Sequence, residues 1–323
     1  MTTANRVNRF SAAGTSRLPD RLFRGTTAVF AAGIVVLLAA IGLLLASSSM
    51  QTWQAFGLGF LTSTTWNPVA NLYGALPFIV GTLVTALLAM VIAAPIGLMT
   101  AIFLAELAPR WLSVPLGFLV ELLAAIPSVV IGLWGVFVLS PLLRGTIEDW
   151  LANSIGKVVP VFAGPSFGVG IFAAGVILAI MVLPTIVSIS REVINAVPNA
   201  QREGMLALGA TRWETTTRAV LPYARSGIIG ALILGLGRAL GETMAVTMVI
   251  GNKPQVPTRL FDQGQTISSQ IATTFNEAAI GLQTSSLIAL GLALLAITIL
   301  LNIVARLLVR RVAGDGVGVA TGG

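Results

Sequence analysis

Long apolar runs constrain the fold of this chain more than any other feature. Six stretches, near 25–46, 76–104, 113–139, 167–189, 227–250 and 282–301, consist mostly of apolar residues and carry very few charges. At 1.5 Å per residue, a helix of about 20 residues crosses a hydrocarbon layer of about 30 Å. Backbone polar groups in that layer must be paired within the protein, which favours helices. The sequence therefore predicts an all-α integral membrane protein with six transmembrane helices.

Composition excludes several classes of function. The chain is 56% hydrophobic and 10% charged, and it contains neither histidine nor cysteine. Thiol chemistry, disulfides and histidine-based metal or acid–base sites are therefore excluded, and we expect no catalytic residue and no metal. The net charge of +7 would suggest nucleic acid in a soluble protein. In a membrane protein the location of the charges matters more, so we expect lipid and no nucleic acid as a partner.

The basic residues predict the orientation. Fourteen of the 19 Lys and Arg fall on one side if the N-terminal tail, the loop near 105–112, the loop 190–226 and the C-terminus share that side. Basic loops face the cytoplasm, so we expect both termini there. The first apolar run is too long for a signal peptide and is expected to remain as a span. The predicted organisation is a basic cytoplasmic tail at 1–24, a six-span domain at 25–308 and a cytoplasmic tail at 309–323.

A polar island at 202–222 separates two of the apolar runs. Gly209 suits the left-handed residue that ends a helix. Thr211 with Glu214 three residues later has the spacing of a capping box, which starts a new helix. We expect a helix, a tight turn and a short helix outside the bilayer. Such a hairpin is either an unliganded surface feature or a dock for another protein, since its tethering between spans disfavours DNA reading.

Three ionisable residues fall within predicted spans: Glu121, Arg238 and Glu242. Arg238 lies near the centre of 227–250, where a guanidinium costs about 2.5–3.5 kcal/mol on insertion scales unless it faces a polar interior. Glu242 is four residues later and would share its helix face. The pair is either a structural salt bridge or part of a transport path. Glu121 is expected either to pair with Arg238 or to face a cytoplasmic cavity.

The glycines around Arg238 favour the functional alternative. Gly237 and Gly241 bracket the arginine at the spacing that allows helices to approach closely, and they leave its side chain room. The planar fork of donors suits a tetrahedral oxyanion. A neighbouring carboxylate would prevent the arginine from holding that anion too tightly. We therefore hypothesise an oxyanion path at Arg238 and Glu242.

The polar island resembles the EAA loop of ABC-importer permeases, whose pattern is E-A-A-x3-G-x9-I-x-L-P. Glu203, Gly209 and Leu221-Pro222 keep its spacing, while Gly204 and Met205 replace the two alanines and Ala219 replaces the isoleucine. The resemblance implies a coupling helix that contacts an ATPase subunit. The residues implied in coupling are Glu203, Gly209, Ala210, Thr211, Arg212, Trp213, Glu214, Leu221 and Pro222.

The segment 237–246, GRALGETMAV, resembles the corresponding segment of the C-type permease of phosphate-specific (Pst) ABC importers. The core RALGE is shared with sulfate and molybdate permeases, and the continuation TMAV points to phosphate. The segments 121–132 and 208–214 are also similar to that family. The resemblance implies the type I ABC importer permease (MetI-like) fold, with Arg238 and Glu242 in the translocation path and Glu121 as a third member.

The resemblance also implies partners for an alternating-access importer in the bacterial inner membrane. These are a second homologous permease (PstA-type), an ABC ATPase dimer (PstB-type) and an extracytoplasmic phosphate-binding protein (PstS-type). The chain itself lacks a P-loop: the pair Gly156-Lys157 is followed by Val158 and has no upstream glycine. We therefore expect no cofactor on this chain, with ATP and Mg²⁺ bound by the ATPase. The alternatives are a sulfate or molybdate permease, a self-sufficient channel or ion-coupled carrier, and a membrane anchor or sensor.

Overall fold

The computed structural model describes residues 17–314, and side chains within 22–307. It divides into two units, Met1–Ser47 and Ser48–Gly323, which are described separately. The described part of the first unit belongs to helix α1 (Arg17–Ser48). This helix starts at Arg17, inside the predicted tail at 1–24, and continues without a break into the first apolar run. Residues 1–16 and 315–323, which make up most of the two predicted tails, lie outside the described residues.

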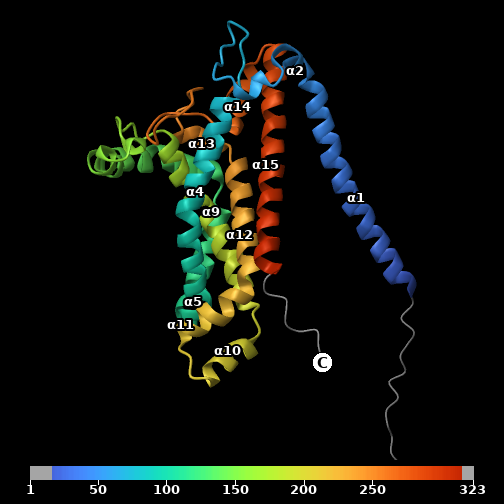
Figure 1. Ribbon diagram of the computed structural model, residues 1–323, viewed down its shortest axis with the longest axis vertical. Helices are drawn as coiled ribbons and strands as arrows, with labels where there is room; N and C mark the ends of the chain where they lie inside the picture. The colour runs from blue at the N-terminus through green and yellow to red at the C-terminus, as the bar shows by residue number, and fades with distance from the viewer. Residues whose placement is uncertain (1–16, 315–323) are drawn as a thin grey trace, which may run out of the picture. The chain divides into compact units, whose positions relative to one another are not determined.

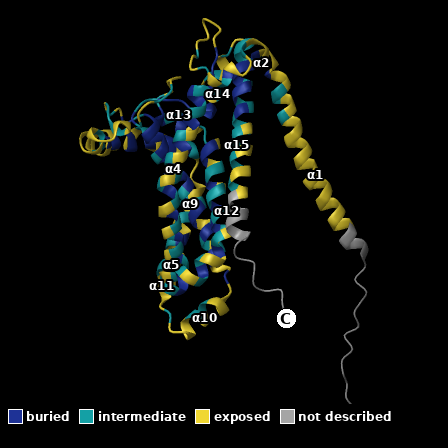
Figure 2. Cartoon of the chain, viewed as in Figure 1, coloured by how far each residue is buried: buried dark blue, intermediate teal, exposed yellow. Residues whose placement is uncertain are grey.

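The second unit is built around four long helices: α4 (Leu76–Ile102), α9 (Ile171–Asn195), α12 (Leu221–Gly241) and α15 (Leu282–Gly314). They run alongside one another in Figure 1. In the most apolar part of α9, 72% of the residues are buried, against 28% or less in the other three helices. Figure 2 shows the same difference. A helix that is apolar on every side belongs in the interior of a bundle, so α9 is the central helix.

Small residues allow the other helices to approach α9. A Cβ at Gly97 of α4 would lie 2.9 Å from Ile186 Cγ2 of α9. On α12, a Cβ at Gly235 would lie 2.9 Å from Val182 Cγ1. Close backbone approach over glycine is how helices pack in lipid, where apolar burial alone does not drive them together. These small residues therefore bring both α4 and α12 close to α9.

Short helices cover the two ends of this bundle. At one end lie α10 (Asn199–Ala207) and α11 (Arg212–Thr215), and α5 (Arg110–Ala125) begins near them (Figure 1). The other end carries α2 (Met50–Phe56), α3 (Gly59–Thr62), α13 (Met244–Val249) and α14 (Ile267–Thr274). There a second apolar core forms from Phe60, Tyr73, Phe78, Ile267 and Leu287.

The described residues contain six candidate membrane spans, which confirms the predicted number: Leu22–Ser48, Leu76–Leu107, Ser128–Asn153, Ile171–Asn195, Arg212–Gly241 and Leu282–Leu307. The predicted third span at 113–139 is wrong in its position. Helix α5 ends at Ala125, and Pro127 begins a new segment. That segment comprises α6 (Ser128–Trp134), α7 (Ser140–Leu142) and α8 (Asp149–Asn153), joined by π-helical turns at Gly135–Leu139 and Leu143–Glu148.

The predicted fifth span at 227–250 is also interrupted. Helix α12 ends at Gly241, Glu242 has an extended backbone (φ −68°, ψ 130°), and α13 starts at Met244. The two interruptions are connected by packing, because α6 and α13 lie side by side. A Cβ at Gly132 of α6 would lie 2.9 Å from Ala245 Cα of α13. The segments 121–132 and 237–246 therefore both contain a helix break, and the short helices after these breaks support each other.

Candidate functional site

Arg238 lies in the last turn of α12, next to the break. The prediction that it sits at the middle of a continuous span is therefore wrong. The exposed carbonyls at a helix C-terminus favour a cation by about 0.3–1 kcal/mol. Helix ends at membrane depth are found where the backbone lines a cavity or a transport site. The break thus supplies part of the stabilisation that a guanidinium at this position needs.

Arg238 and Glu242 do not form the predicted pair on one helix face. The Arg238 side chain is exposed, and its Nη1 donates a hydrogen bond to Thr185 Oγ1 of α9 at 3.4 Å. Glu242 is beyond the end of α12, and its Oε1 accepts a hydrogen bond from the Ala245 backbone N–H at 3.3 Å. Within the described residues no ion pair joins them. The carboxylate instead sits at the N-terminus of α13, where a negative charge is favoured.

The glycines beside Arg238 leave open space. A Cβ added at Gly237 or at Gly241 would have no neighbouring atom within 4 Å, so no helix of the described chain packs there. The close approach that this glycine spacing allows is therefore not used within the described chain. Arg238 therefore lies between two glycines that face open space, and its one hydrogen bond among the described residues goes to the Thr185 hydroxyl rather than to a carboxylate.

Glu121 lies on α5, away from Arg238. Its exposed side chain lines a cavity of about 270 Å³ with a mixed polar and apolar wall, together with Arg191 and Glu192 of α9. No hydrogen bond or ion pair connects Glu121 to Arg238 among the residues that the structure describes. Of the two arrangements expected for Glu121, pairing with Arg238 or facing a cavity, the structure has the second.

The turn predicted from Gly209 and Thr211 is confirmed. Gly209 has φ +84°, its N–H bonds to Leu206 O at 3.0 Å, and the Ala210 N–H bonds to Met205 O at 3.1 Å. These two bonds form a Schellman motif, which satisfies the last carbonyls of α10. Thr211 then caps α11: its Oγ1 accepts from the Glu214 N–H at 3.3 Å, and Glu214 Oε2 accepts from the Thr211 N–H at 2.9 Å.

The predicted short second helix is not separate. After α11 the chain continues through a π-helical turn at Thr216–Val220 directly into α12, so one helical segment runs from Arg212 to Gly241. Pro222 stands in the first turn of α12, where its missing N–H is tolerated next to the wider turn. Leu221 packs against the buried residues around Val220 and Ala224. Leu221 and Pro222 thus fix the start of α12.

We expect Thr211→Ala to destabilise the start of α11 by about 1 kcal/mol, because it removes the hydroxyl that caps the Glu214 N–H. Hydrogen exchange at the Glu214 amide should become about fivefold faster. Thr211→Ser keeps the hydroxyl and is the matched control. Equal exchange rates in the Ala and Ser variants would show that the hydroxyl does not cap the helix.

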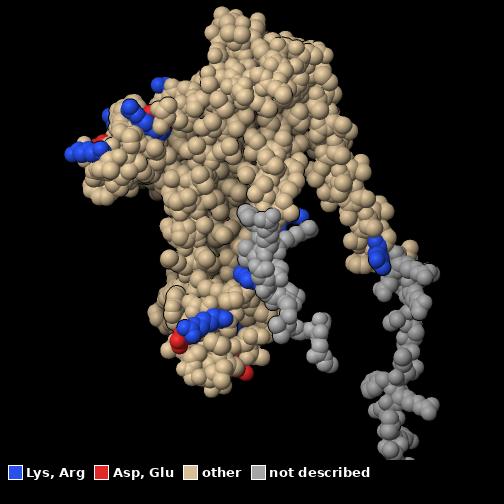
Figure 3. All heavy atoms as spheres, in the orientation of Figure 1, with Lys and Arg blue, Asp and Glu red and all other residues tan. Residues whose placement is uncertain are grey.

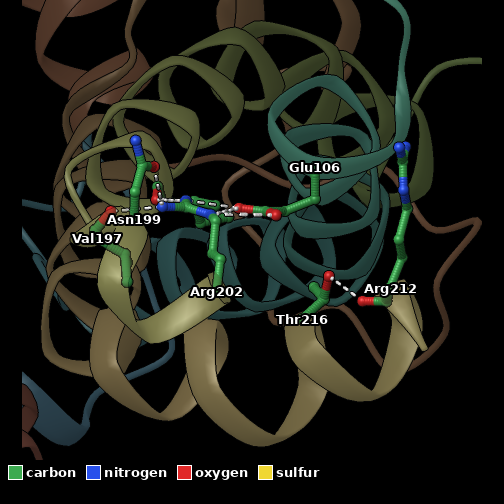
Figure 4. A network of polar contacts seen from close by, with 7 residues as sticks. Glu106, Val197, Asn199, Arg202, Arg212 and Thr216 are labelled. Carbon is green, nitrogen blue, oxygen red and sulfur yellow. Dashed lines mark hydrogen bonds and ion pairs between the residues drawn. The ribbon is translucent and has the colours of Figure 1, made fainter. Parts of the chain in front are cut away.

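Arg202 anchors α10 to the bundle, and Figure 4 shows its contacts. Its Nη2 forms an ion pair with Glu106 Oε1 at 2.7 Å, and Nε donates to the same oxygen at 3.1 Å. Glu106 belongs to the π-helical turn Phe103–Leu107 at the end of α4. Nη2 also donates to Ile194 O at 2.8 Å, and Nη1 donates to Val197 O. One side chain therefore joins α10 to the ends of α4 and α9.

Sequence reasoning did not assign this role to Arg202 and Glu106, which are 96 positions apart. Glu106 itself could have indicated this link. It directly follows an apolar run, and it lies on the same side of the predicted membrane as the basic loop 190–226, where an acid is expected to find a basic partner. Figure 4 also shows a separate, local hydrogen bond, in which the Arg212 carbonyl accepts from Thr216 Oγ1 at 2.9 Å one turn later.

The outer surface of α10 and α11 carries large exposed apolar side chains among charged ones. Leu208 is 85% exposed and Trp213 is 59% exposed, and Glu203 in α10 and Gly209 in the turn after it are also exposed. On the face that Figure 3 shows, the charged side chains of the second unit lie near its two ends. One of these groups surrounds α10 and α11. Large apolar side chains exposed on a structured loop indicate a surface that binds a partner.

Three curated phosphate permease proteins are similar in sequence to this chain over most of its length. "Phosphate transport system permease protein PstC" of Mesorhizobium japonicum is 47% identical over 298 residues, which cover 91% of each chain. The PstC protein of Haemophilus influenzae is 47% identical over 90% of this chain and 93% of its own. "Phosphate transport system permease protein PstC 2" of Mycobacterium tuberculosis is 39% identical over 90% and 92%.

Solved structures show the same fold. A bacterial alginate ABC transporter in complex with its alginate-bound periplasmic protein superposes with a TM-score of 0.59 at 17% identity, covering 92% of this chain and 98% of that chain. A second alginate importer structure gives 0.56 at 18% identity, covering 90% and 99%. Residues 93–314 match the family model described as "Binding-protein-dependent transport system inner membrane component". The chain belongs to this family of ABC-importer permeases.

Proposed function

We propose that the chain is the permease subunit of an ATP-driven importer of inorganic phosphate. The observation that carries the proposal is an exposed guanidinium, Arg238, at a helix break between two glycines that face open space, in a chain similar to curated phosphate permeases. A fork of charged donors binds phosphate oxygens well. The motif continues through Thr243–Val246 in the manner expected of phosphate permeases.

The chain supplies half of the path by alternating access. Arg238 and Glu242 face this path, and a second homologous permease closes it from the other side. The anion replaces the bond partners that Arg238 lacks in the isolated chain, where Thr185 Oγ1 is 3.4 Å away. Such a site holds phosphate only weakly, since tight binding in both states would stop the cycle.

Coupling to ATP hydrolysis uses α10 and α11. The exposed Leu208 and Trp213 dock into a groove of an ATPase dimer, which binds ATP and Mg²⁺. The ends of α4 and α9 follow α10 because Arg202 joins all three. This surface and both termini face the cytoplasm, as the excess of basic residues on that side indicates.

Reconstitution tests the proposal. The chain, a second permease, the ATPase dimer and a phosphate-binding protein are assembled in proteoliposomes, and uptake of radiolabelled phosphate is measured with and without ATP. We expect uptake only with all components and ATP. Uptake by this chain alone would favour a channel or an ion-coupled carrier. Uptake of sulfate or molybdate without phosphate would assign another oxyanion.

A further inference from the structure

The cavity that Glu121 lines holds a second arginine. It is about 270 Å³ in volume and lies between α5, α9 and the end of α4. Its polar lining consists of Glu121 on α5 and Ser188, Arg191, Glu192 and Asn195 on α9. The cavity lies at the same end of the bundle as α10 and its anchor Arg202. A volume of this size accommodates a small oxyanion with some water.

Arg191 has unused hydrogen-bond donors. Its Nε is buried without a partner, and no ion pair joins its guanidinium to Glu121 or Glu192 within the part of the chain that the structure describes. A buried donor without a partner is costly, and this cost is larger for a charged group. The guanidinium is directed at Gly117, where an added Cβ would lie only 2.0 Å from Nη1. Glycine at 117 therefore leaves the space that the guanidinium occupies.

A polar face of α9 connects this cavity to Arg238. Thr185, Ser188, Glu192 and Asn195 are spaced by three, four and three residues, which places them on one side of the helix. Thr185 is the residue to which Arg238 donates its hydrogen bond. At 1.5 Å per residue, Thr185 and Arg191 are about 9 Å apart along the helix axis. Polar side chains of α9 therefore extend from the hydrogen-bond partner of Arg238 to the cavity that holds Arg191.

We propose that the cavity is a second phosphate position on the inward side of the path, with Arg191 as its principal donor and Ser188 as a further one. The proposal rests on the proposed function and adds a release step to it. Glu121 and Glu192 oppose the anion, so its stay is short, which suits release into the cytoplasm. Arg191 and these carboxylates repeat, at the exit, the combination of Arg238 with Glu242.

Transport assays on the assembled complex test this assignment. We expect Arg191→Gln to lower the phosphate imported per ATP hydrolysed by about tenfold, the effect of about 1.4 kcal/mol. Arg191→Lys keeps the charge without the fork and should restore part of the loss. Gly117→Ala keeps the arginine but displaces it, and should lower the ratio about threefold. The matched control is Arg306→Gln, an exposed arginine of α15 outside the cavity, with a ratio equal to wild type.

Two outcomes would overturn the assignment. One is an unchanged ratio of phosphate to ATP in both Arg191→Gln and Gly117→Ala. The other is an equal fall in uptake, ATP hydrolysis and complex yield, as expected of an arginine that only supports the fold. If the wild-type complex imports no phosphate at all, the proposed function itself fails. Normal wild-type import with normal Arg191→Gln import would reject the second position alone.

Because the chain contains no cysteine, a direct measurement of occupancy is available. Ser188→Cys introduces a single thiol into the cavity, and its modification by a charged methanethiosulfonate reagent is followed in the complex. Inorganic phosphate at millimolar concentration should slow the modification at least about threefold, through occupancy of the cavity. The control is Ser226→Cys, an exposed position on α12 outside the cavity, where phosphate should change nothing. Equal modification of Ser188→Cys with and without phosphate would contradict the proposal.

Discussion

Arg238→Gln is expected to reduce phosphate uptake by the complete transporter about 100-fold or more. Glutamine keeps much of the side-chain length and its polarity but lacks the charge and the fork. Losing charge-assisted hydrogen bonds to an anion costs about 1.5–3 kcal/mol each, and about 2.7 kcal/mol corresponds to two orders of magnitude. The measurement is the initial rate of ATP-dependent phosphate uptake in proteoliposomes.

The same substitution should leave assembly intact. The Arg238 side chain is exposed and makes one long hydrogen bond, to Thr185, among the described residues. Its removal therefore withdraws little from the packing of α12 against α9. Thr185→Val removes the same bond without the guanidinium and should lower uptake by less than about fivefold. Normal uptake in Arg238→Gln, with normal complex yield, would show that no anion uses this arginine.

Local chemistry explains what the sequence predicted well. The number of spans follows from runs of apolar residues, because lipid requires such runs however the helices are arranged. The turn between α10 and α11 follows from Gly209, Thr211 and Glu214, whose bonds reach no further than five residues. These interactions join residues that are close together in the sequence, so the sequence alone predicts them. The structure confirms the turn.

The helix breaks could not be predicted in the same way. Hydropathy does not distinguish one span of 24 residues from a helix, a break and a second short helix, so 227–250 was predicted as continuous. The break after Gly241 depends on packing of Ala245 and Met248 against Gly132, more than 110 positions earlier. It changes the physical setting of Arg238 from mid-span to helix end. Oxyanion binding at Arg238 remains a prediction. The carbonyls at the end of α12 now supply part of the stabilisation that a guanidinium in the middle of a span would lack.

The second long-range feature is the link between Arg202 and Glu106, and its disruption should have the next largest effect. Both side chains are largely buried, with 18% and 10% of their surface exposed. Arg202→Ala leaves the Glu106 carboxylate without its partner and removes one of the donors to Ile194 O, which keeps the Val197 N–H. Breaking a buried pair in this way costs about 3–5 kcal/mol. Since α10 is then no longer joined to α4 and α9, ATP hydrolysis should continue while phosphate uptake falls at least about tenfold.

A double-mutant cycle identifies the cause. Glu106→Ala together with Arg202→Ala should be less harmful than Arg202→Ala alone, because no unpaired carboxylate remains buried. Exchanging the charges with Glu106→Arg and Arg202→Glu should not restore coupling, since a carboxylate at 202 repels the carbonyls of Ile194 and Val197 that Arg202 now binds. Glu277→Ala, an exposed acid at the other end of the bundle, is the control. Full rescue by the exchange would mean that Arg202 acts only as the partner of Glu106, and that α9 is moved by other contacts.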